Sequence, residues 1–333
     1  MDTTGEQHRL TTDHEPRSRD KDGEHFVLTL LTESLAQEKL GRLSEVLAQH
    51  GFRVQRSRPL TQIDGACTCL EFVIEGDPEA LSNLRAVLLE LSNAAGMDLA
   101  LRAERHDYRY FRLAVFDMDS TLIEAEVIDE LAKEMGVGDE VASVTAAAMR
   151  GELDFQRSFR KRVALLKGLS ETRLVAVAER ILLTSGAERL FRVLKRLAIK
   201  TAVCSGGFTF MGERLRQRLG LDYIYANDLE IKDGVVTGDV PSDVVDGNRK
   251  AELVKDIAAR EGIRLDQVIA VGDGANDLPM INLAGMGVAF RAKPVVRASA
   301  KYSISHGGLD TLLYLIGLHE DEIRAAESDS RGC

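Results

Sequence analysis

The sequence predicts an α/β protein made of two units: a smaller α+β unit, followed by a larger one built on a doubly wound, mostly parallel sheet. From residue 113 onward, short apolar runs alternate with helical patterns, as in sheets whose strands are joined by crossover helices. Before residue 107, the apolar periodicity follows the order β-α-β-β-α-β. A chain of 333 residues is long enough for two sizeable cores.

The smaller unit is expected over residues 25–106, after a polar tail at 1–24 that we expect to be disordered. Apolar spacing predicts strands at 26–31, 52–57, 67–75 and 98–104, and helices at 35–50 and 78–95. This is the ferredoxin-like, or split βαβ, order. It resembles the ACT-like regulatory domains that precede several amino-acid enzymes. The loop at 32–34 lacks the glycine-rich turn of ligand-binding ACT domains, so a structural role or homodimer formation stays open beside regulation.

The larger unit is expected over residues 112–318, with a flexible tail at 319–333. Buried strands are predicted at 113–116, 200–204, 268–271 and 286–289, with a weaker one near Tyr302. The segment 124–185 has only helical patterns and exceeds one crossover helix, so we expect it to form a lid. Residues 224–240 are expected to form a second excursion, a hairpin that turns at Asp233 and Gly234.

Composition excludes several classes of protein. With 53 acidic and 43 basic residues the net charge is -10, which argues against a nucleic-acid partner. No apolar stretch has the length of a membrane span, and the polar N-terminus does not resemble a signal peptide. Four cysteines do not make a disulfide framework, so we expect a cytoplasmic protein. Cys67 and Cys69 share one strand face, where packing is favoured over a metal or redox pair.

Two aspartates follow the first strand of the larger unit. Asp117 and Asp119 come directly after the buried run 113–116, at the carboxyl edge of the sheet, where open α/β sheets bind ligands. Two carboxylates at this spacing repel each other unless a cation lies between them. One of them could also attack a substrate while the other transfers a proton. The pattern therefore predicts a metal site, a catalytic site or both.

Three further segments place polar groups at the same edge. Ser205 precedes Gly206 and Gly207, a turn that either binds phosphate oxygens or only redirects the chain. A tight loop after the strand 268–271 supplies oxygen ligands that suit Mg²⁺, namely Asp273, Asn276 and Asp277. A basic residue at the start of the helix predicted after residues 246–248 could neutralise a phosphoryl group. Lys250 is the first candidate, and Arg249 and Lys255 are its rivals.

The order of these four motifs resembles the haloacid dehalogenase superfamily of phosphotransferases. The resemblance implies an aspartyl-phosphate mechanism, in which Asp117 attacks phosphorus and Asp119 acts first as the acid and then as the base. It also implies that Mg²⁺ lies between Asp117, the backbone carbonyl of Asp119 and Asp273, with Asp277 supporting the metal shell.

Within that superfamily, residues 113–315 resemble the phosphoserine phosphatase family through the segments 117–126, 151–155, 160–163, 205–210 and 272–280. The resemblance implies that Glu126 holds the ammonium group of the substrate, Arg162 holds its carboxylate and Phe155 closes the pocket. It also implies further substrate contacts from Ser205, Gly206, Lys250 and Asn276. The plainer alternatives are that Glu126 is an ordinary first-turn acid and that Arg162 belongs to a solvated basic face.

The implied activity is Mg²⁺-dependent hydrolysis of O-phospho-L-serine to L-serine and phosphate, the last step of serine biosynthesis. Two enzymatic alternatives use the same chemistry, on another small phosphate ester or with transfer to an acceptor such as homoserine. An amino-acid sensor with an inert phosphatase domain is the alternative from another class. The complete set of Asp117, Asp119, Lys250 and Asp273 argues against that sensor, because an idle site has no physical need for so many carboxylates.

Overall fold

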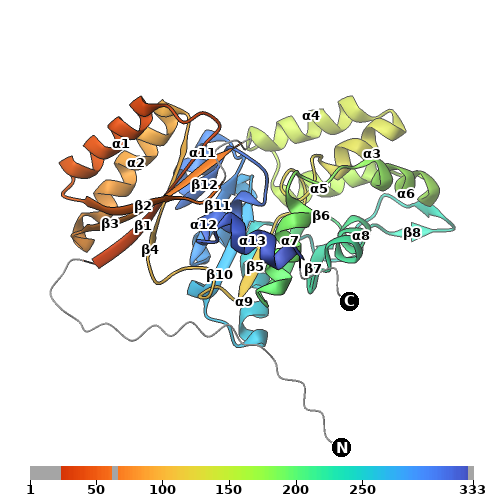
Figure 1. Ribbon diagram of the computed structural model, residues 1–333. Helices are drawn as coiled ribbons and strands as arrows, with labels where there is room; N and C mark the ends of the chain where they lie inside the picture. The colour runs from red at the N-terminus through yellow and green to blue at the C-terminus, as the bar shows by residue number, and fades with distance from the viewer. Residues whose placement is uncertain (1–23, 62–66, 329–333) are drawn as a thin grey trace, which may run out of the picture.

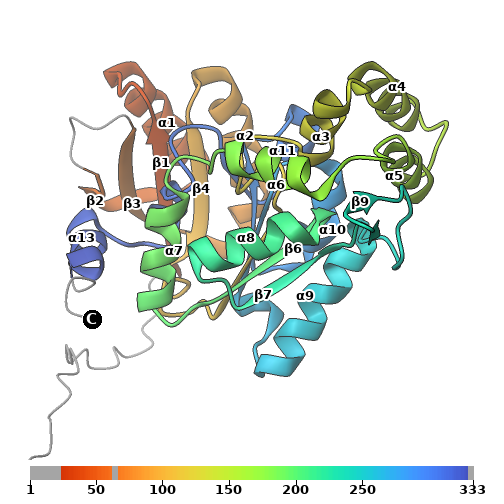
Figure 2. The ribbon, with the colours of Figure 1, turned by 90° about the vertical axis from the view of Figure 1, so that its right-hand side faces the viewer.

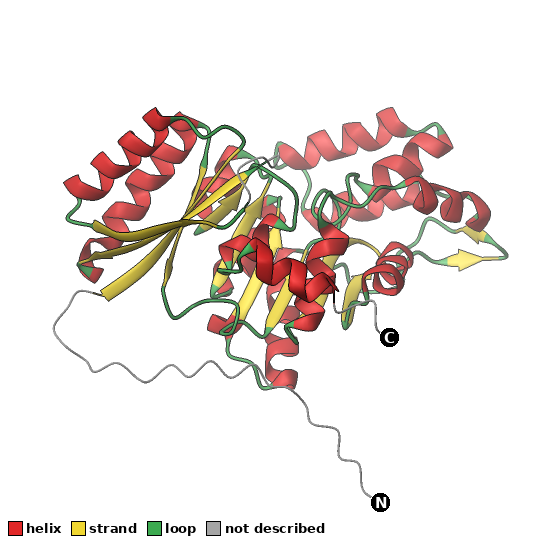
Figure 3. Cartoon of the chain, viewed as in Figure 1, coloured by secondary structure: helices red, strands yellow, loops and turns green. Residues whose placement is uncertain are grey.

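The computed structural model describes residues 24–61 and 67–328, which contain one antiparallel and one parallel sheet together with a small hairpin (Figure 1). The tail predicted at 1–24 lies almost wholly outside the described residues. Helices flank both larger sheets (Figure 3), which confirms the predicted combination of an α+β unit with an α/β unit.

The N-terminal unit has the predicted β-α-β-β-α-β order. Its elements are β1 (Glu24–Thr32), α1 (Gln37–Gln49), β2 (Arg53–Pro59), β3 (Thr68–Gly76), the 3-10 helix η1 (Pro78–Ala80), α2 (Leu81–Ala95) and β4 (Asp98–Ala103). The antiparallel strand order β2-β3-β1-β4 places β3 between β1 and β2, and β1 between β3 and β4. Each βαβ unit is therefore split by a strand of the other, as the ferredoxin-like arrangement requires.

The N-terminal sheet is covered on both faces. Leu28 and Leu30 of β1 pack with the core formed by α1 and α2, whereas Leu31 belongs to the core of the C-terminal unit. Cys69 and Ala100 join that second core from β3 and β4. Figure 1 shows α1 and α2 on one side of this sheet and β12 on the other. Because successive side chains of a strand point to opposite faces, one sheet contributes to two cores.

Buried polar contacts also join the two units. Asp98 at the start of β4 has no exposed surface. Its carboxylate accepts hydrogen bonds from Oγ of Ser303 (3.3 Å) and from the backbone N–H groups of Ser305 (2.5 Å) and His306 (3.1 Å). These donors lie in and just after β12, so the C-terminal unit supplies the hydrogen bonds that this buried charge requires.

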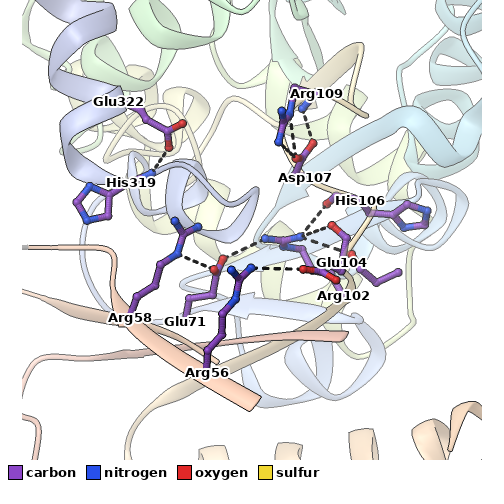
Figure 4. A network of polar contacts seen from close by, with 11 residues as sticks. Arg56, Arg58, Glu71, Arg102, Glu104, His106, Asp107, Arg109, His319 and Glu322 are labelled. Carbon is purple, nitrogen blue, oxygen red and sulfur yellow. Dashed lines mark hydrogen bonds and ion pairs between the residues drawn. The ribbon is translucent and has the colours of Figure 1, made fainter. Parts of the chain in front are cut away.

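An ion-pair network lies within the N-terminal sheet, beside the chain that leaves it (Figure 4). Glu71 is buried in β3 and pairs with Arg58 of β2 (2.8 Å) and with the buried Arg102 of β4 (3.2 Å). Arg102 also donates from Nη1 to the backbone carbonyls of Glu104 (3.3 Å) and His106 (3.5 Å). The chain that leaves the N-terminal sheet is thereby tied to the sheet's own core.

Six parallel strands form the sheet of the C-terminal unit, in the order β12-β11-β10-β5-β6-β7. The strands are β5 (Leu113–Phe116), β6 (Lys200–Phe208), β7 (Tyr223–Asn227), β10 (Val268–Gly272), β11 (Met286–Phe290) and β12 (Tyr302–Ile304). This confirms the predicted doubly wound sheet. The expectation for residues 224–240 was wrong in part, because 223–227 form the edge strand β7 and only the shorter hairpin beyond them leaves the sheet.

Helices cover both faces of this sheet. Its helices are α7 (Ala187–Arg196), α8 (Thr209–Leu219), α9 (Gly247–Glu261), α10 (Leu278–Leu283), α11 (Pro294–Ser299) and α12 (Thr311–Leu315), with the 3-10 helices η2 (Leu265–Gln267) and η3 (Ala275–Asp277). The buried side chains of α9 and α10 pack on one face with Val115, whereas those of α7, α8 and α12 pack on the other with Phe116. Neighbouring residues of β5 thus serve opposite layers.

The predicted lid is all-helical, with α3 (Val127–Met135), α4 (Gly138–Met149), α5 (Phe155–Ala164) and α6 (Glu171–Arg180). The hairpin of β8 (Ile231–Lys232) and β9 (Val235–Val236) joins it, because the N–H of Gly168 donates to the carbonyl of Val236 (2.9 Å) and the N–H of Val236 to that of Leu169 (2.8 Å). Figure 2 shows α5 beside β9, so the two excursions from the sheet form one body.

The C-terminal segment differs from the expected flexible tail. Residues Glu320–Ser328 form the helix α13, which lies beside α7 (Figure 1). Ile323 is fully buried, and Arg189 of α7 pairs with Glu320 (2.8 Å) and Glu327 (3.3 Å). The acidic residues of this segment are therefore held by a basic helix. Residues 329–333 lie outside the described part of the chain.

None of the described helices has the length and apolar character that crossing a membrane requires. Cys69 packs in the core and Cys67 lies half-buried beside Gly307, and both thiols are free. Burial raises the pKa of the Cys67 thiol to about 11. This environment fits packing, the interpretation favoured from the sequence, and keeps the thiol protonated at neutral pH.

Candidate active site

The carboxyl end of β5 carries the first two candidate residues. The backbone N–H of Asp117 donates to the carbonyl of Val271 (2.9 Å), so the ladder between β5 and β10 continues one residue past the strand. The side chain of Met118 is fully buried. Asp117 and Asp119, on either side of it, both lie at the carboxyl edge of the sheet, as the sequence predicted.

Asp117 meets two other carboxylates there. Its ligand atoms and those of Asp273 and Asp277 lie within 4.8 Å of one another. Asp277 is fixed by the loop itself, since its Oδ2 accepts the N–H groups of Asp273 (3.1 Å) and Gly274 (2.9 Å). Oδ1 of Asp273 accepts a hydrogen bond from Oγ1 of Thr121 (3.0 Å). The loops after β5 and β10 therefore hold the three acids together.

Lys250 is the basic residue that reaches this cluster. Its Nζ lies 2.8 Å from Oδ1 of Asp117 and 2.6 Å from Oδ1 of Asp277, and the side chain has no exposed surface. Burial opposes the charge of Lys250, but the two carboxylates outweigh it and raise its pKa above the usual value. The rivals Arg249 and Lys255 are exposed, and Arg249 pairs with a neighbouring acid of its own helix.

The acids outnumber the cation. Burial, followed by the charge of Asp117, raises the pKa of Asp273 to about 6 and also raises that of Asp277. Burial and the charges of Glu126 and Asp117 hold the pKa of Asp119 well above its usual range. Within the described residues, Oδ1 of Asp119 is buried and has no hydrogen-bond partner. Such a crowded set of oxygen ligands fits a hard divalent cation such as Mg²⁺.

The Ser205 turn lies against the same acids. Oγ of Ser205 accepts a hydrogen bond from the N–H of Gly207 (2.9 Å). A Cβ atom on Gly207 would lie 2.5 Å from Cε of Met118 and 3.0 Å from Oδ2 of Asp119, so only glycine lets the backbone come this close. The turn does more than redirect the chain, because it brings its backbone next to Asp119.

The lid reaches the site through α5. Phe155, its first residue, contacts the turn so closely that a Cβ on Gly206 would lie 3.0 Å from Cζ of the ring. Arg162, farther along α5, has a buried Nε without a hydrogen-bond partner among the described residues. Burial lowers the pKa of Arg162, whereas the carboxylates of Asp129, Glu126 and Asp119 oppose the shift. Arg162 therefore does not belong to a solvated face.

Glu126 lies at the start of α3, where it precedes the first helical residue. Its Oε1 accepts a hydrogen bond from Oγ of Ser120 (2.8 Å), and Ser120 has a left-handed φ of 56°. Burial is the main cause that raises the pKa of Glu126, with the charge of Asp117 adding to it. The half-buried Asn276 sits in η3, and its carbonyl packs against Gly247 at the start of α9.

Two residues at the site were not singled out from the sequence. Thr121 belongs to the first motif, but its hydrogen bond to Asp273 joins loops that lie 152 residues apart. Asn227 is fully buried at the carboxyl end of β7. Its position follows the same rule that found Asp117 and Asp273, so recognition of β7 as a strand would have identified it.

Comparisons with known proteins show which sequences this chain is similar to. The family profile of haloacid dehalogenase-like hydrolases matches residues 114–282. The chain is 44% identical over 302 residues to a phosphoserine phosphatase of Streptomyces coelicolor, a match that covers 91% of this chain and 73% of that protein.

Two solved structures are also similar to this chain. A HAD family hydrolase from Salmonella enterica matches 88% of this chain and 99% of its own, with a TM-score of 0.79 and 33% identity. A structure described as a phospho-aspartyl intermediate analogue of phosphoserine phosphatase matches 61% of this chain and 98% of its own. Its TM-score is 0.58 and its identity 45%.

Proposed function

The chain belongs to the haloacid dehalogenase-like hydrolases, within the phosphoserine phosphatase family, and we propose that it hydrolyses O-phospho-L-serine to L-serine and phosphate. The observation that carries the proposal is the buried contact between Lys250 and Asp117, beside the acids of the β10 loop and below the lid residues Glu126 and Arg162. The product would place the enzyme at the end of serine biosynthesis.

The reaction would proceed in two displacements. In the first, a carboxylate oxygen of Asp117 attacks phosphorus, and the bond from phosphorus to the serine oxygen breaks as Asp119 gives that oxygen its proton. In the second, Asp119 takes a proton from a water molecule, which attacks the phosphorus. The bond between Asp117 and phosphorus then breaks, and both carboxyl groups return to their starting states. Burial of Asp119 without a partner for Oδ1 supports the proton-transfer role.

Magnesium would be held by the carboxylates of Asp117 and Asp273 and the backbone carbonyl of Asp119, with Asp277 supporting them, and would supply positive charge against the phosphoryl oxygens. The described residues fit this role because three carboxylates share the space beside a single ammonium group. Lys250 would contact the phosphoryl group, together with Ser205 and Gly206 from the turn and Asn276 from η3.

Selection of serine would depend on the lid. Glu126 would bind the substrate ammonium group and Arg162 its carboxylate, with Phe155 closing the pocket against Gly206. The unpartnered Nε of Arg162 supports this, because a buried guanidinium needs an acceptor that a substrate carboxylate could supply. A substrate with an ammonium group and a carboxylate close to its phosphate would satisfy both residues while the phosphate lies at Asp117.

The test is phosphate release from a panel of phosphomonoesters, with magnesium and with a chelator. We expect O-phospho-L-serine with magnesium to give the highest kcat/KM. Phosphoethanolamine, which lacks the carboxylate, and p-nitrophenyl phosphate, which lacks both groups, should be much poorer substrates. Equal rates on all three esters would contradict the proposed substrate, and full activity in the chelator would contradict the metal requirement.

A further inference from the structure

The edge of the parallel sheet has an irregular register where the turn begins. Cys204 of β6 pairs with Tyr225 of β7, and Phe208 pairs with Asn227. Three residues of β6, at 205–207, therefore lie opposite one residue of β7, Ala226. Bulges of this kind interrupt the ladder and redirect the backbone beside functional sites. The backbone groups of the turn must consequently find partners outside the regular ladder.

The side chain of Asn227 provides one such partner. Its Nδ2 donates to the carbonyl of Gly206 (2.8 Å), and its Oδ1 accepts the backbone N–H of Val245 (2.8 Å). Asn227 has no exposed surface, and Val245 is also buried. Because a carbonyl only accepts and a backbone N–H only donates, the two contacts fix which end of the amide faces each partner.

We propose that Asn227 is a positioning residue for the phosphoryl group: it sets the orientation of the turn 205–207 and its separation from Lys250. The inference rests on the proposed phosphatase function, because it concerns groups that would bind the substrate's phosphate. The carbonyl of Gly206 and the N–H of Gly207 belong to one trans peptide, in which they point in opposite directions. By holding the carbonyl, Asn227 directs that N–H toward Oγ of Ser205, on a turn whose Gly207 lies against Asp119.

The second contact extends the effect to the lysine. Val245 precedes Asp246, which caps α9 by accepting the N–H of Arg249 with its side chain (2.9 Å). The carbonyl of Asp246 accepts the N–H of Lys250 (2.9 Å). One amide group thus connects the Ser205 turn with the start of the helix that carries the buried lysine. Neither a smaller side chain nor an apolar one can make both contacts.

The test measures phosphate affinity separately from turnover. In Asn227→Ala the Gly206–Gly207 peptide is free to rotate, so we expect the Kd for inorganic phosphate, measured by calorimetry with magnesium, to rise roughly tenfold to a hundredfold. The KM for O-phospho-L-serine should rise in parallel. The milder Asn227→Ser keeps a hydroxyl that is too short for both partners, and it should change both constants in the same direction.

Thr201→Val is the matched control. Thr201 is buried at the other end of β6, and its hydroxyl bonds to Asp222 (3.3 Å), so the variant loses a hydrogen bond far from the site. It should lower Tm but leave the phosphate Kd unchanged.

If Asn227→Ala does not fold, the measurements on Asn227→Ser decide. A folded Asn227 variant with wild-type Kd and KM, or one that loses only kcat and Tm together, would overturn the inference. Wild-type protein that binds phosphate but does not hydrolyse phosphoserine would instead refute the proposed substrate.

Discussion

The ammonium nitrogen of Lys250 lies 2.8 Å from Oδ1 of Asp117, and neither side chain is more than 8% exposed. This contact depends on the start of α9, because Asp246 caps the helix and turns Lys250 toward the sheet edge. A fixed positive charge beside this carboxylate would also face the negative charge that a phosphoryl group brings. Such a preorganised charge costs no reorganisation when the reaction occurs.

Asp117→Asn should abolish turnover and leave the fold intact. The amide has nearly the same shape, and its oxygen can still accept hydrogen bonds from Lys250 and from the N–H of Met118. Without metal, Tm should equal or exceed that of wild type, because the change removes charge repulsion from Asp273 and Asp277. Phosphate release and calorimetry check the two parts. Sustained turnover by the folded variant would exclude covalent attack by Asp117.

Asp273→Asn should weaken magnesium binding by roughly 100-fold or more, because it removes a charged ligand from a site of few ligands. Isothermal titration of the free protein with magnesium measures this without reference to activity. Asp256→Asn, an equal change of charge on the exposed side of α9, should bind magnesium as wild type does. If both variants bind alike, Asp273 is not a ligand.

Arg162→Ala should lower kcat/KM for O-phospho-L-serine by roughly thirty-fold to several-thousand-fold, the range for deleting one partner of a buried charge pair. Phosphoethanolamine and p-nitrophenyl phosphate lack the carboxylate, so their values should hardly change. The exposed Arg157 on the same helix offers the control, and Arg157→Ala should behave as wild type on all three esters.

Glu126→Gln should show the complementary pattern, with larger losses on phosphoserine and phosphoethanolamine than on p-nitrophenyl phosphate. The amide keeps an oxygen for the hydroxyl of Ser120, so the turn at the start of α3 should persist. Steady-state kinetics on the three esters distinguish this from a structural effect. Uniform losses would mean that Glu126 supports the lid and does not recognise the amino group.

Asp98→Ala should destabilise the protein by roughly 2 to 4 kcal/mol, because it removes a fully buried acceptor and leaves the N–H groups of Ser305 and His306 without their partner. Urea denaturation gives the free energy of unfolding. Glu90→Ala, on the exposed face of α2, should change it by less than about 0.5 kcal/mol. A neutral result for Asp98→Ala would show that apolar contacts alone hold the two units together.

Glu320→Gln should destabilise the attachment of α13 in a pH-dependent way. Burial opposes the charge of Glu320, but hydrogen bonds from Tyr314, Arg324 and Arg189 outweigh it and lower its pKa. A depressed folded-state pKa contributes stability above the unfolded pKa, about 4.3, which is lost as pH falls through the folded value.

The variant should therefore unfold more easily than wild type at pH 7 by about 1 to 3 kcal/mol, and the difference should shrink toward pH 3. Urea titrations at several pH values provide the comparison. Asp321→Asn, whose carboxylate is exposed, is the control. A difference that grows in acid would reverse the assigned sign.

At the carboxyl edge of the sheet, the sequence located candidate residues wherever it predicted the strand before them. Asp117 and Asp273 each follow an apolar run, so the carboxyl-edge rule placed them correctly. Asn227 was missed because the strand before it, Tyr223–Asn227, contains polar and aromatic residues at the sheet edge and was read as part of the hairpin. An edge strand has one neighbour and fewer buried positions, which weakens its apolar signal.

The choice among Arg249, Lys250 and Lys255 could not be made from composition. It depends on which face of α9 points to the site, which the cap at Asp246 fixes, and on the carboxylates that pair with the side chain.

The helix at 320–328 was missed for a related reason. Its charges are typical of a solvated tail until Arg189, more than 130 residues earlier in the chain, is placed beside them.

The burial of the N-terminal sheet on both faces bears on how freely this unit can be exchanged. A module joined only by a linker can be replaced by any domain of the same fold, whereas this one shares Leu31, Cys69 and Ala100 with the core of its neighbour. A chimaera carrying a foreign ferredoxin-like domain would need a matching inner face, including an acceptor where Asp98 stands. Recombination at the linker around residues 104–112 would therefore join two units that each have a complete fold but do not pack against each other. The two units would have to be exchanged together.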